Sequence, residues 1–179
     1  NFEQKQNYSI RVKGIDPGEL TLEKTFNINV LDLNDPPTAI SLDNASVAEN
    51  LKKGAIVGKL TATDEDVGDK LTYKLPSPDT GGNPDNAFFS LSGNQLRTAA
   101  TLDFENRDRY NIRMQVTDSG GAVFEQDLLV QVTGSNDPPT LITLSAESVA
   151  EGLPIGHIVG NLSASDPDPG DSHTFRIAG

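Results

Sequence analysis

Residues 103–114 read DFENRDRYNIRM, and residues 1–12 read NFEQKQNYSIRV. The two stretches lie 102 residues apart (103 − 1), and the same offset carries NDPPT at 34–38 onto NDPPT at 136–140. No gap is needed between the matched segments, and none of them is low in complexity. The sequence therefore predicts a tandem-repeat architecture rather than a single globular unit.

The offset divides the chain into one complete repeat and two partial ones. We expect the complete repeat at residues 38–138, the C-terminal part of a preceding repeat at 1–37, and the N-terminal part of the next repeat at 139–179. Each partial repeat lacks strands that the complete one has, so neither is expected to form a full domain alone. The first residues show no signal-peptide pattern and are interpreted as the interior of a longer protein.

Within the complete repeat the pattern indicates strands only. Tyr110, Ile112, Met114 and Val116 alternate with polar residues, which is typical of a strand with one buried face. Turn sequences rich in Gly, Pro, Asn and Asp separate about seven such segments over roughly 100 residues, a pattern typical of immunoglobulin-like sandwiches. The predicted fold is all-β: seven-stranded Greek-key β-sandwich repeats in tandem, joined by short proline-stiffened junctions.

Composition excludes several classes of function. The formal net charge of −12 disfavours binding to nucleic acid or to an anionic membrane surface. The chain has no Cys, so it has neither disulfides nor thiolate metal ligands. No apolar run approaches the ~20 residues that cross a bilayer, so membrane insertion of this segment is not expected. Acidity alone is usually a matter of solubility, but here the acids recur at repeated positions.

The recurring acids form groups beside strands and at the repeat boundaries. They are Asp103 with Glu105, Asp32 with Asn34 and Asp35, Asp64 with Asp66, Glu49, and Asp118. Calcium takes about 6–8 oxygen ligands, mainly from carboxylates and carbonyls. In sandwiches stacked end to end, the junction acids of one repeat face the acids of the next. One interpretation is that these acids bind a shared cation, and the alternative is that they are separate, solvated turn residues.

These groups resemble the motifs of the cadherin repeat family over the whole chain. DFE at 103–105 resembles the family's Asp-Arg-Glu motif, DLND at 32–35 resembles Asp-x-Asn-Asp, and DED at 64–66 resembles Asp-x-Asp. Glu49 resembles the early Glu of Pro-Glu-Asn, and Asp118 resembles the late Asp that reaches back to the preceding junction. The sequence of the repeat looks most like that of bacterial cadherin-like repeats in large surface or secreted proteins.

The resemblance implies calcium (Ca²⁺) at each junction, bound by residues at matching positions. For the first junction these residues are Glu3, Asp32, Asn34, Asp35, Asp64, Asp66 and Asp118. For the second junction they are Glu49, Asp103, Glu105, Asn136, Asp137, Asp166 and Asp168. Asp69 and Asp171 are expected to add a backbone carbonyl.

Two departures from the repeat change the ligand sets. Asn1 stands where Asp103 stands in the complete repeat, and Gly134 stands where Asp32 stands one repeat earlier. Each junction therefore lacks one acid that the other has, and the full set of three ions per junction that the family implies is not expected at either.

The resulting hypothesis is a calcium-rigidified spacer or adhesin segment of an extracellular, cell-surface protein acting in cell adhesion. An enzyme is not expected, because the only two His, His157 and His173, lie outside the complete repeat. Expected partners are calcium and adjacent repeats, with other surface proteins or polysaccharide considered as well. The alternatives are a polysaccharide-binding module, which the few aromatic residues disfavour, and an accessory module of a secreted hydrolase.

Overall fold

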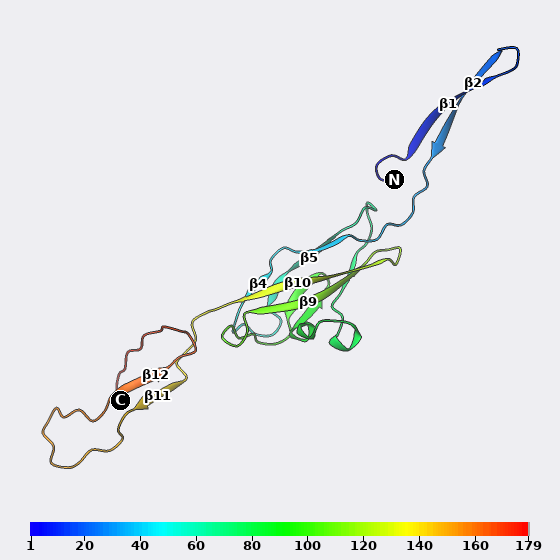
Figure 1. The fold of residues 1–179 in the computed structure, drawn as a ribbon. Helices are drawn as coiled ribbons and strands as arrows, with labels where there is room; N and C mark the ends of the chain where they lie inside the picture. Colours follow the sequence, from blue (N-terminus) through cyan, green and yellow to red (C-terminus); the bar gives the residue numbers. More distant parts are fainter. Residues whose placement is uncertain (179) are drawn as a thin grey trace.

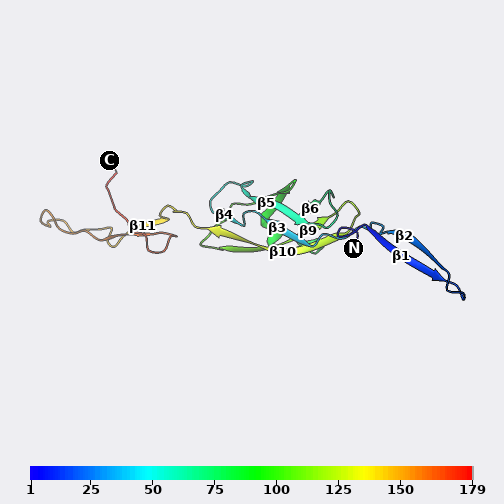
Figure 2. The ribbon, with the colours of Figure 1, turned by 90° about the horizontal axis from the view of Figure 1, so that it is seen from above.

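The computed structural model describes residues 1–178 and shows an elongated molecule with one sandwich at its centre (Figure 1). A two-stranded hairpin of β1 (Asn7–Ile15) and β2 (Thr21–Asn29) extends from one end. A second two-stranded sheet, β11 (Leu141–Leu144) with β12 (Leu162–Ser165), lies beyond the other end. The three parts follow one another along a single long axis, as Figure 2 also shows from above.

The central sandwich consists of two four-stranded sheets. One sheet has the order β4-β10-β9-β6 and the other has the order β3-β5-β8-β7. The strands are β3 (Ala39–Leu42), β4 (Ser46–Ala48), β5 (Ile56–Thr63), β6 (Thr72–Lys74), β7 (Phe89–Ser92), β8 (Gln95–Thr98), β9 (Arg109–Thr117) and β10 (Val123–Thr133). This arrangement confirms the all-β, immunoglobulin-like sandwich that the sequence predicts.

The core lies between these two sheets and follows from the period-two pattern of β9. Tyr110, Ile112, Met114 and Val116 all point inward and are at most 4% exposed. They pack against residues of the opposite sheet such as Leu60, which is fully buried. Each such side chain contributes about 1.5–3 kcal/mol by leaving water, so this alternation is sufficient to fix which face of β9 is inside.

The first strand of the sandwich is divided between the two sheets, which the sequence pattern did not predict. β3 pairs antiparallel with β5, whereas β4 pairs parallel with the last strand, β10. Between them the Asn44 side chain donates to the carbonyls of Ser46 and Val57, at 2.8 and 2.7 Å, and so bends the chain across the sandwich. A three-residue strand is too short to give a recognisable alternation, which is why this segment was not expected.

Two short 3₁₀ helices, η1 (Pro78–Thr80) and η2 (Pro84–Phe88), occupy one of the segments between strands, where the sequence pattern indicated turns only. Both begin with a proline at their start, where its fixed φ suits a helical turn and its missing N–H costs nothing. Asn83 caps η2 by accepting a hydrogen bond from the N–H of Asp85 at 3.2 Å. The segment is therefore ordered by local turn chemistry rather than by apolar periodicity.

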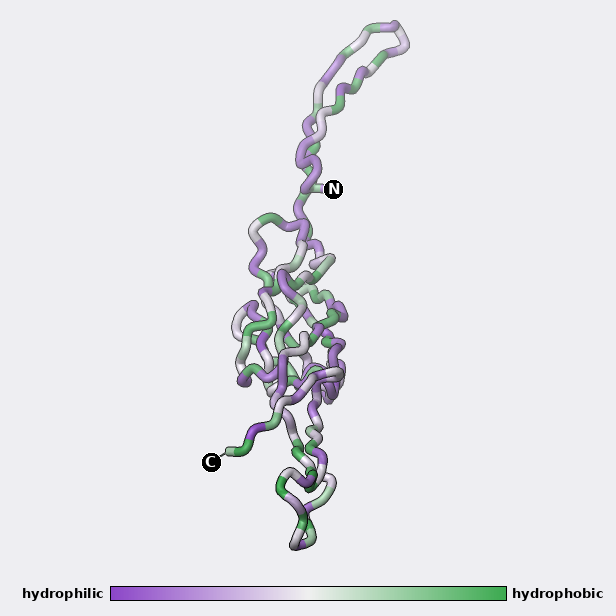
Figure 3. Tube along the Cα trace, turned by 90° about the vertical axis from the view of Figure 1, so that its left-hand side faces the viewer, coloured by the Kyte–Doolittle hydropathy of each residue, from purple (hydrophilic) through white to green (hydrophobic). Residues whose placement is uncertain are grey.

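The terminal segments are not sandwiches within residues 1–178. Every residue of β1 and β2 is exposed, and Ile10 is 46% exposed although its counterpart in the complete repeat, Ile112, is fully buried. Figure 3 shows hydrophobic and hydrophilic residues mixed along this hairpin, as in a strand pair built for a core. No helix in the described part of the chain is both long enough and apolar enough to cross a lipid bilayer.

Candidate metal centres at the two junctions

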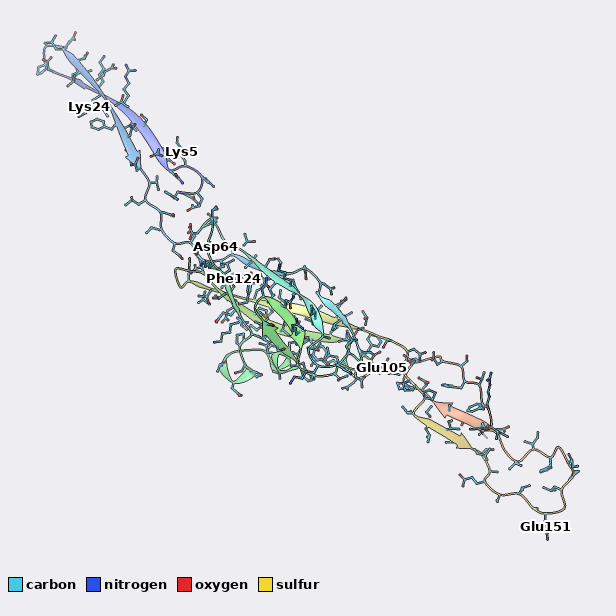
Figure 4. The ribbon with its side chains drawn as sticks, turned by 180° about the vertical axis from the view of Figure 1, so that it is seen from behind. Lys5, Lys24, Asp64, Glu105, Phe124 and Glu151 are labelled. Atoms are coloured by element: carbon cyan, nitrogen blue, oxygen red, sulfur yellow. The ribbon has the colours of Figure 1, made fainter. Side chains whose placement is uncertain are left out.

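Acidic side chains gather at both ends of the central sandwich. We call the region around Asp32–Asp35 the first junction and the region around 134–137 the second junction. Figure 4 places Asp64 at the end of the sandwich that faces the hairpin and Glu105 at the end that faces β11 and β12. Four acidic groups, each with carboxylate oxygens within 4.8 Å of one another, lie at these two ends. The distribution matches the expectation that strand ends and connecting loops collect acids at the poles of a sandwich.

The first junction holds a group formed by Glu3, Asp35 and Asp66 from three separate segments. Asp35 is anchored through its backbone, because its N–H donates to Asp66 Oδ2 at 2.8 Å. Desolvation together with the charges of Glu3, Glu65, Asp66 and Asp64 raises the pKa of Asp35. The group is therefore under mutual repulsion that an added positive charge would remove.

A second group at the first junction consists of Asp64, Asp69 and Asp118. Asp118 accepts a hydrogen bond from the Asn34 amide at 2.9 Å, and this bond holds the pKa of Asp118 below its usual range. Asp69 is held by Ser119, whose hydroxyl donates to Asp69 Oδ1 at 2.6 Å. The first contact ties the junction segment to the loop after β9, and the second ties that loop to the loop after β5.

Gly120 makes this close approach possible. A Cβ at position 120 would lie 1.7 Å from Asn34 Oδ1 and 2.2 Å from its side-chain carbon. The glycine after Asp118 and Ser119 therefore leaves the space that the Asn34 amide occupies, and any larger residue would displace the Asn34 side chain from Asp118. The contact with Asn34 therefore explains why a glycine stands at position 120 in the TDSGG sequence at 117–121.

The first junction also contains a hollow of about 570 Å³. Its lining residues are Phe2, Glu3, Gln6, Asp32, Asn34, Glu65, Asp66, Val67 and Asp69. Asp32 lines this hollow but belongs to neither acidic group. The hollow is open and predominantly acidic, so it suits a small cation with its water better than an apolar ligand.

At the second junction Glu49, Asp103 and Glu105 form the third group. Glu49 is only 2% exposed and accepts hydrogen bonds from the N–H groups of Phe104 at 2.6 Å and Ser135 at 2.7 Å. Burial raises the pKa of Glu49, but these hydrogen bonds outweigh burial and hold it below its ordinary value. Burial and the nearby Glu49 charge raise the pKa of Glu105.

The fourth group, Asp166, Asp168 and Asp171, lies in the segment that follows the second junction. Asp137 N–H donates to Asp168 Oδ2 at 2.6 Å, which reproduces at an offset of 102 the contact between Asp35 and Asp66. His173 stands at the position of Leu71 and lies 2.9 Å from Asp166 Oδ2, and this contact lowers the pKa of Asp166. The two junctions therefore share the same backbone-to-carboxylate contact, and the second junction has in addition the imidazole of His173.

Two groups of predicted residues are placed differently from the expectation. Asp137 accepts a hydrogen bond from the Asn50 amide at 2.7 Å instead of joining an acidic group, and the Asn136 amide donates to the Asp137 carbonyl. The carboxylates of Asp69 and Asp171, expected to offer only backbone oxygens, join the acidic groups themselves. An acid three residues after Asp-x-Asp in both repeats is the signal that could have found them.

The two departures from the repeat are also accommodated. The Asn1 amide donates to Glu65 Oε2 at 2.8 Å, and the counterpart of Glu65 at the second junction is Pro167. A Cβ on Gly134 would lie 3.1 Å from the Phe104 ring, so this ring covers the place where an aspartate side chain would begin. At the first junction Asn1 thus pairs with an acid that the second junction lacks, whereas at the second junction an aromatic ring covers the position of the missing acid.

The donor set fits a hard divalent cation. The residues of the four groups supply only carboxylate oxygens, and Asn34 adds an amide. The buried oxygen Asp64 Oδ2 has no hydrogen-bond donor among the described residues. Such an oxygen needs a partner, and calcium is the biological cation that prefers this many oxygens from flexible segments.

Comparison with known proteins gives consistent matches. The family model described as Cadherin domain matches residues 43–133. Human Protocadherin Fat 4 is 32% identical over 183 residues, and human Protocadherin-1 is 28% identical over 191 residues. These alignments cover 94% and 99% of this chain but only 4% and 18% of the two relatives, so the chain spans a small part of their length.

A solved structure resembles the chain as well. The extracellular cadherin domains 1–4 of Protocadherin Gamma B7 superimpose with a TM-score of 0.67 at 26% sequence identity. The match covers 95% of this chain and 43% of that one. It therefore includes both terminal segments together with the central sandwich.

Proposed function

This chain belongs to the cadherin family, and on that premise we propose that it is a calcium-binding segment of an extracellular, cell-surface protein, acting as a rigidified spacer or adhesin in calcium-dependent adhesion. The role is structural rather than catalytic. The relatives support an extracellular adhesion-type repeat, and the acidic groups support the calcium dependence. That the chain comes from a bacterial surface protein stays a prediction, based on the sequence of the repeat.

One observation supports the proposal most directly. At both junctions the N–H of the aspartate before the two prolines donates to the second aspartate of an Asp-x-Asp motif in the following repeat. That second aspartate in turn donates its own N–H to the first, at 3.0 Å in one junction and 3.1 Å in the other. A repeated arrangement that brings acids together against their repulsion is expected where a cation compensates for it.

The residues that we propose as ligands are those of the four acidic groups together with Asp32, Asn34, Asn136 and Asp137 from the junction segments. At the first junction they are Glu3, Asp32, Asn34, Asp35, Asp64, Asp66, Asp69 and Asp118. At the second junction they are Glu49, Asp103, Glu105, Asn136, Asp137, Asp166, Asp168 and Asp171. Bound calcium supplies charge neutralisation between adjacent repeats. The chain itself orients the carboxylates through the backbone and amide contacts described above and limits bending with Pro36–Pro37 and Pro138–Pro139.

The first prediction is therefore that the chain binds calcium and is stabilised by it. We expect calorimetric titration to detect binding in the range of about 0.1–1 mM that is usual for extracellular calcium modules. The melting temperature should rise with calcium concentration as mass action requires. As a control, the double variant Asp66→Asn and Asp168→Asn removes one carboxylate from each junction and should bind weakly. Absence of both heat and stabilisation in the wild-type chain at 10 mM calcium would refute the proposal.

A further inference from the structure

An ion pair between buried Asp85 and the exposed side chain of Arg107 lies beside residues 103–108 at the second junction. Asp85, at the start of η2, is 6% exposed and accepts hydrogen bonds from both terminal nitrogens of Arg107, with Nη1 at 2.7 Å. Asp85 also accepts a hydrogen bond from the Asn111 N–H at 2.7 Å. The carboxylate thus joins η2, the loop after Leu102 and strand β9 at one point.

Asp85, the Arg109 carbonyl and the Tyr110 ring contact the guanidinium group of Arg107, whose side chain is otherwise 43% exposed. Its Nε donates to the Arg109 carbonyl at 2.7 Å, and its central carbon lies 4.5 Å from the centroid of the Tyr110 ring. Tyr110 is a core residue that packs against Phe88 and Phe89 with ring centroids 5.1 and 5.6 Å apart. The bidentate acid and the aromatic face together favour one orientation of the planar guanidinium.

Residues 103–108, which we call the acidic loop, contain Asp103 and Glu105 and are held at both ends. At the start, the Phe104 N–H donates to Glu49. At the end, the Arg107 N–H donates to the Asp103 carbonyl at 3.0 Å, while the Asn106 N–H donates to the Asp103 carboxylate at 2.8 Å. The side chain of Arg107 then fastens this closed turn to the sandwich.

The preceding repeat contains a weaker version of this arrangement. Lys5 stands at the position of Arg107, its N–H donates to the Asn1 carbonyl at 3.2 Å, and its ammonium lies 4.5 Å from the centroid of the Tyr8 ring. A lysine keeps the charge and the aromatic contact but cannot form the bidentate fork. The contact between a cation and a tyrosine ring therefore recurs in both repeats. The bidentate pair of Arg107 with Asp85 is found at the second junction.

We infer that Arg107, locked by Asp85 and Tyr110, is a positioning residue that holds the acidic loop in its ligand geometry before calcium arrives. The inference rests on the proposed calcium function. The charge of Glu49 repels that of Glu105 in the metal-free protein. Backbone hydrogen bonds hold the chain on either side of the acidic loop, from the Asn50 N–H to the Leu102 carbonyl at 3.0 Å and from the Val132 N–H to the Asp108 carbonyl at 2.8 Å. Within the loop, the ion pair with Asp85 opposes outward movement of Asp103 and Glu105 without contacting the ligand oxygens.

The inference can be tested because positioning and simple electrostatics predict opposite results. Removing a positive charge near a cation site should tighten calcium binding by Coulomb's law. If Arg107 positions the loop, Arg107→Gln should instead weaken binding at the second junction, by about tenfold, the lower end of the loss seen when groups that orient metal ligands are removed. Arg107→Lys, which keeps charge and stack, should give an intermediate loss.

The measurement is a calcium titration of the full 179-residue chain followed by amide NMR signals. The N–H groups of Phe104 and Ser135 report the second junction, and the N–H of Asp35 reports the first. Arg113→Gln is the matched control, because Arg113 also binds two acids, Glu125 and Asp127, but on the outer face of β9 and β10.

The outcomes separate the inference from the proposed function. If the wild-type signals of Asp35 and Phe104 do not respond to 10 mM calcium, the proposed function fails. If they respond, but Phe104 titrates at the same calcium concentration in Arg107→Gln and Arg113→Gln, the positioning role fails even if the melting temperature falls. Should Arg107→Gln not fold, Arg107→Lys decides by the same comparison.

Discussion

At the scale of single residues, the buried carboxylate of Glu49 links an acidic group to two backbone segments. It belongs to an acidic group and also satisfies two backbone N–H groups, one from the acidic loop and one from the second junction. The sequence showed only an isolated acid before Asn50. Its burial could not be predicted, because it depends on β4 crossing to the sheet of β10. This crossing places Glu49 beside Thr133, and the Glu49 N–H donates to the Thr133 carbonyl at 3.0 Å.

A substitution at Glu49 should therefore affect both stability and calcium binding. Glu49→Gln replaces one acceptor oxygen by a donor that faces a backbone N–H, so we expect a loss of about 1–3 kcal/mol in the free energy of unfolding in calcium-free buffer. Denaturant unfolding measures this loss, and calcium binding at the second junction should weaken as well. Glu147→Gln, at an exposed acid outside the four groups, should change neither quantity.

The lowered pKa of Glu49 predicts that acid reduces the stability of the folded chain. The folded pKa of Glu49 is below its ordinary value, so its contribution to stability is fully present at neutral pH and is lost as the pH falls through the lowered value. The wild-type chain should therefore lose stability on acidification to a greater extent than Glu49→Gln. An equal loss in both proteins would mean that other carboxylates dominate.

At the scale of elements, the offset of 102 places identical strand patterns in different surroundings. β9 and β1 share the pattern of alternating apolar residues, yet only β9 has an opposite sheet in the described part of the chain. The sequence predicted the strands of the complete repeat from this alternation. It did not predict β4, whose pairing depends on the Asn44 turn, nor the 3₁₀ helices, which depend on local proline and cap chemistry.

This contrast predicts unequal effects of equal substitutions. Ile112→Ala removes a fully buried side chain and should cost about 2–5 kcal/mol, because a cavity remains between the sheets. Ile10→Ala changes a side chain that is 46% exposed and should shift unfolding of the central sandwich by less than about 0.5 kcal/mol. Denaturant unfolding of both variants tests the difference, and equal losses would show that the hairpin has an unrecognised core.

At the scale of the whole molecule, the three parts lie along one axis and meet at two acidic junctions (Figure 1). Sequence reasoning located most of the residues in these groups, since repeated motifs mark them. It missed the carboxylates of Asp69 and Asp171, and it could not tell that Asp137 faces an amide, because side-chain direction depends on loop conformation.

Calcium should control the shape of this axis. In 5 mM calcium we expect small-angle scattering to give one extended particle, because neutralised junctions hold adjacent repeats in line. In chelator the junctions should bend within the limits set by their prolines, so the radius of gyration should fall and the distribution of distances should broaden. The Asp66→Asn and Asp168→Asn double variant should resemble the chelated protein at both calcium levels. Identical scattering of the wild-type chain with and without calcium would contradict a stiffening role.

A spacer of the kind that we propose would be pulled as well as bent. The chain enters the central sandwich near the first junction and leaves through β10 at the second, and β4 runs parallel to the end of β10 through the pairs Ser46–Gln131, Val47–Val132 and Ala48–Thr133. Tension applied at the two ends would slide these strands past each other, so their backbone hydrogen bonds would resist together instead of peeling open one by one. The short strand that no sequence pattern revealed is thus the place where this module would withstand mechanical force.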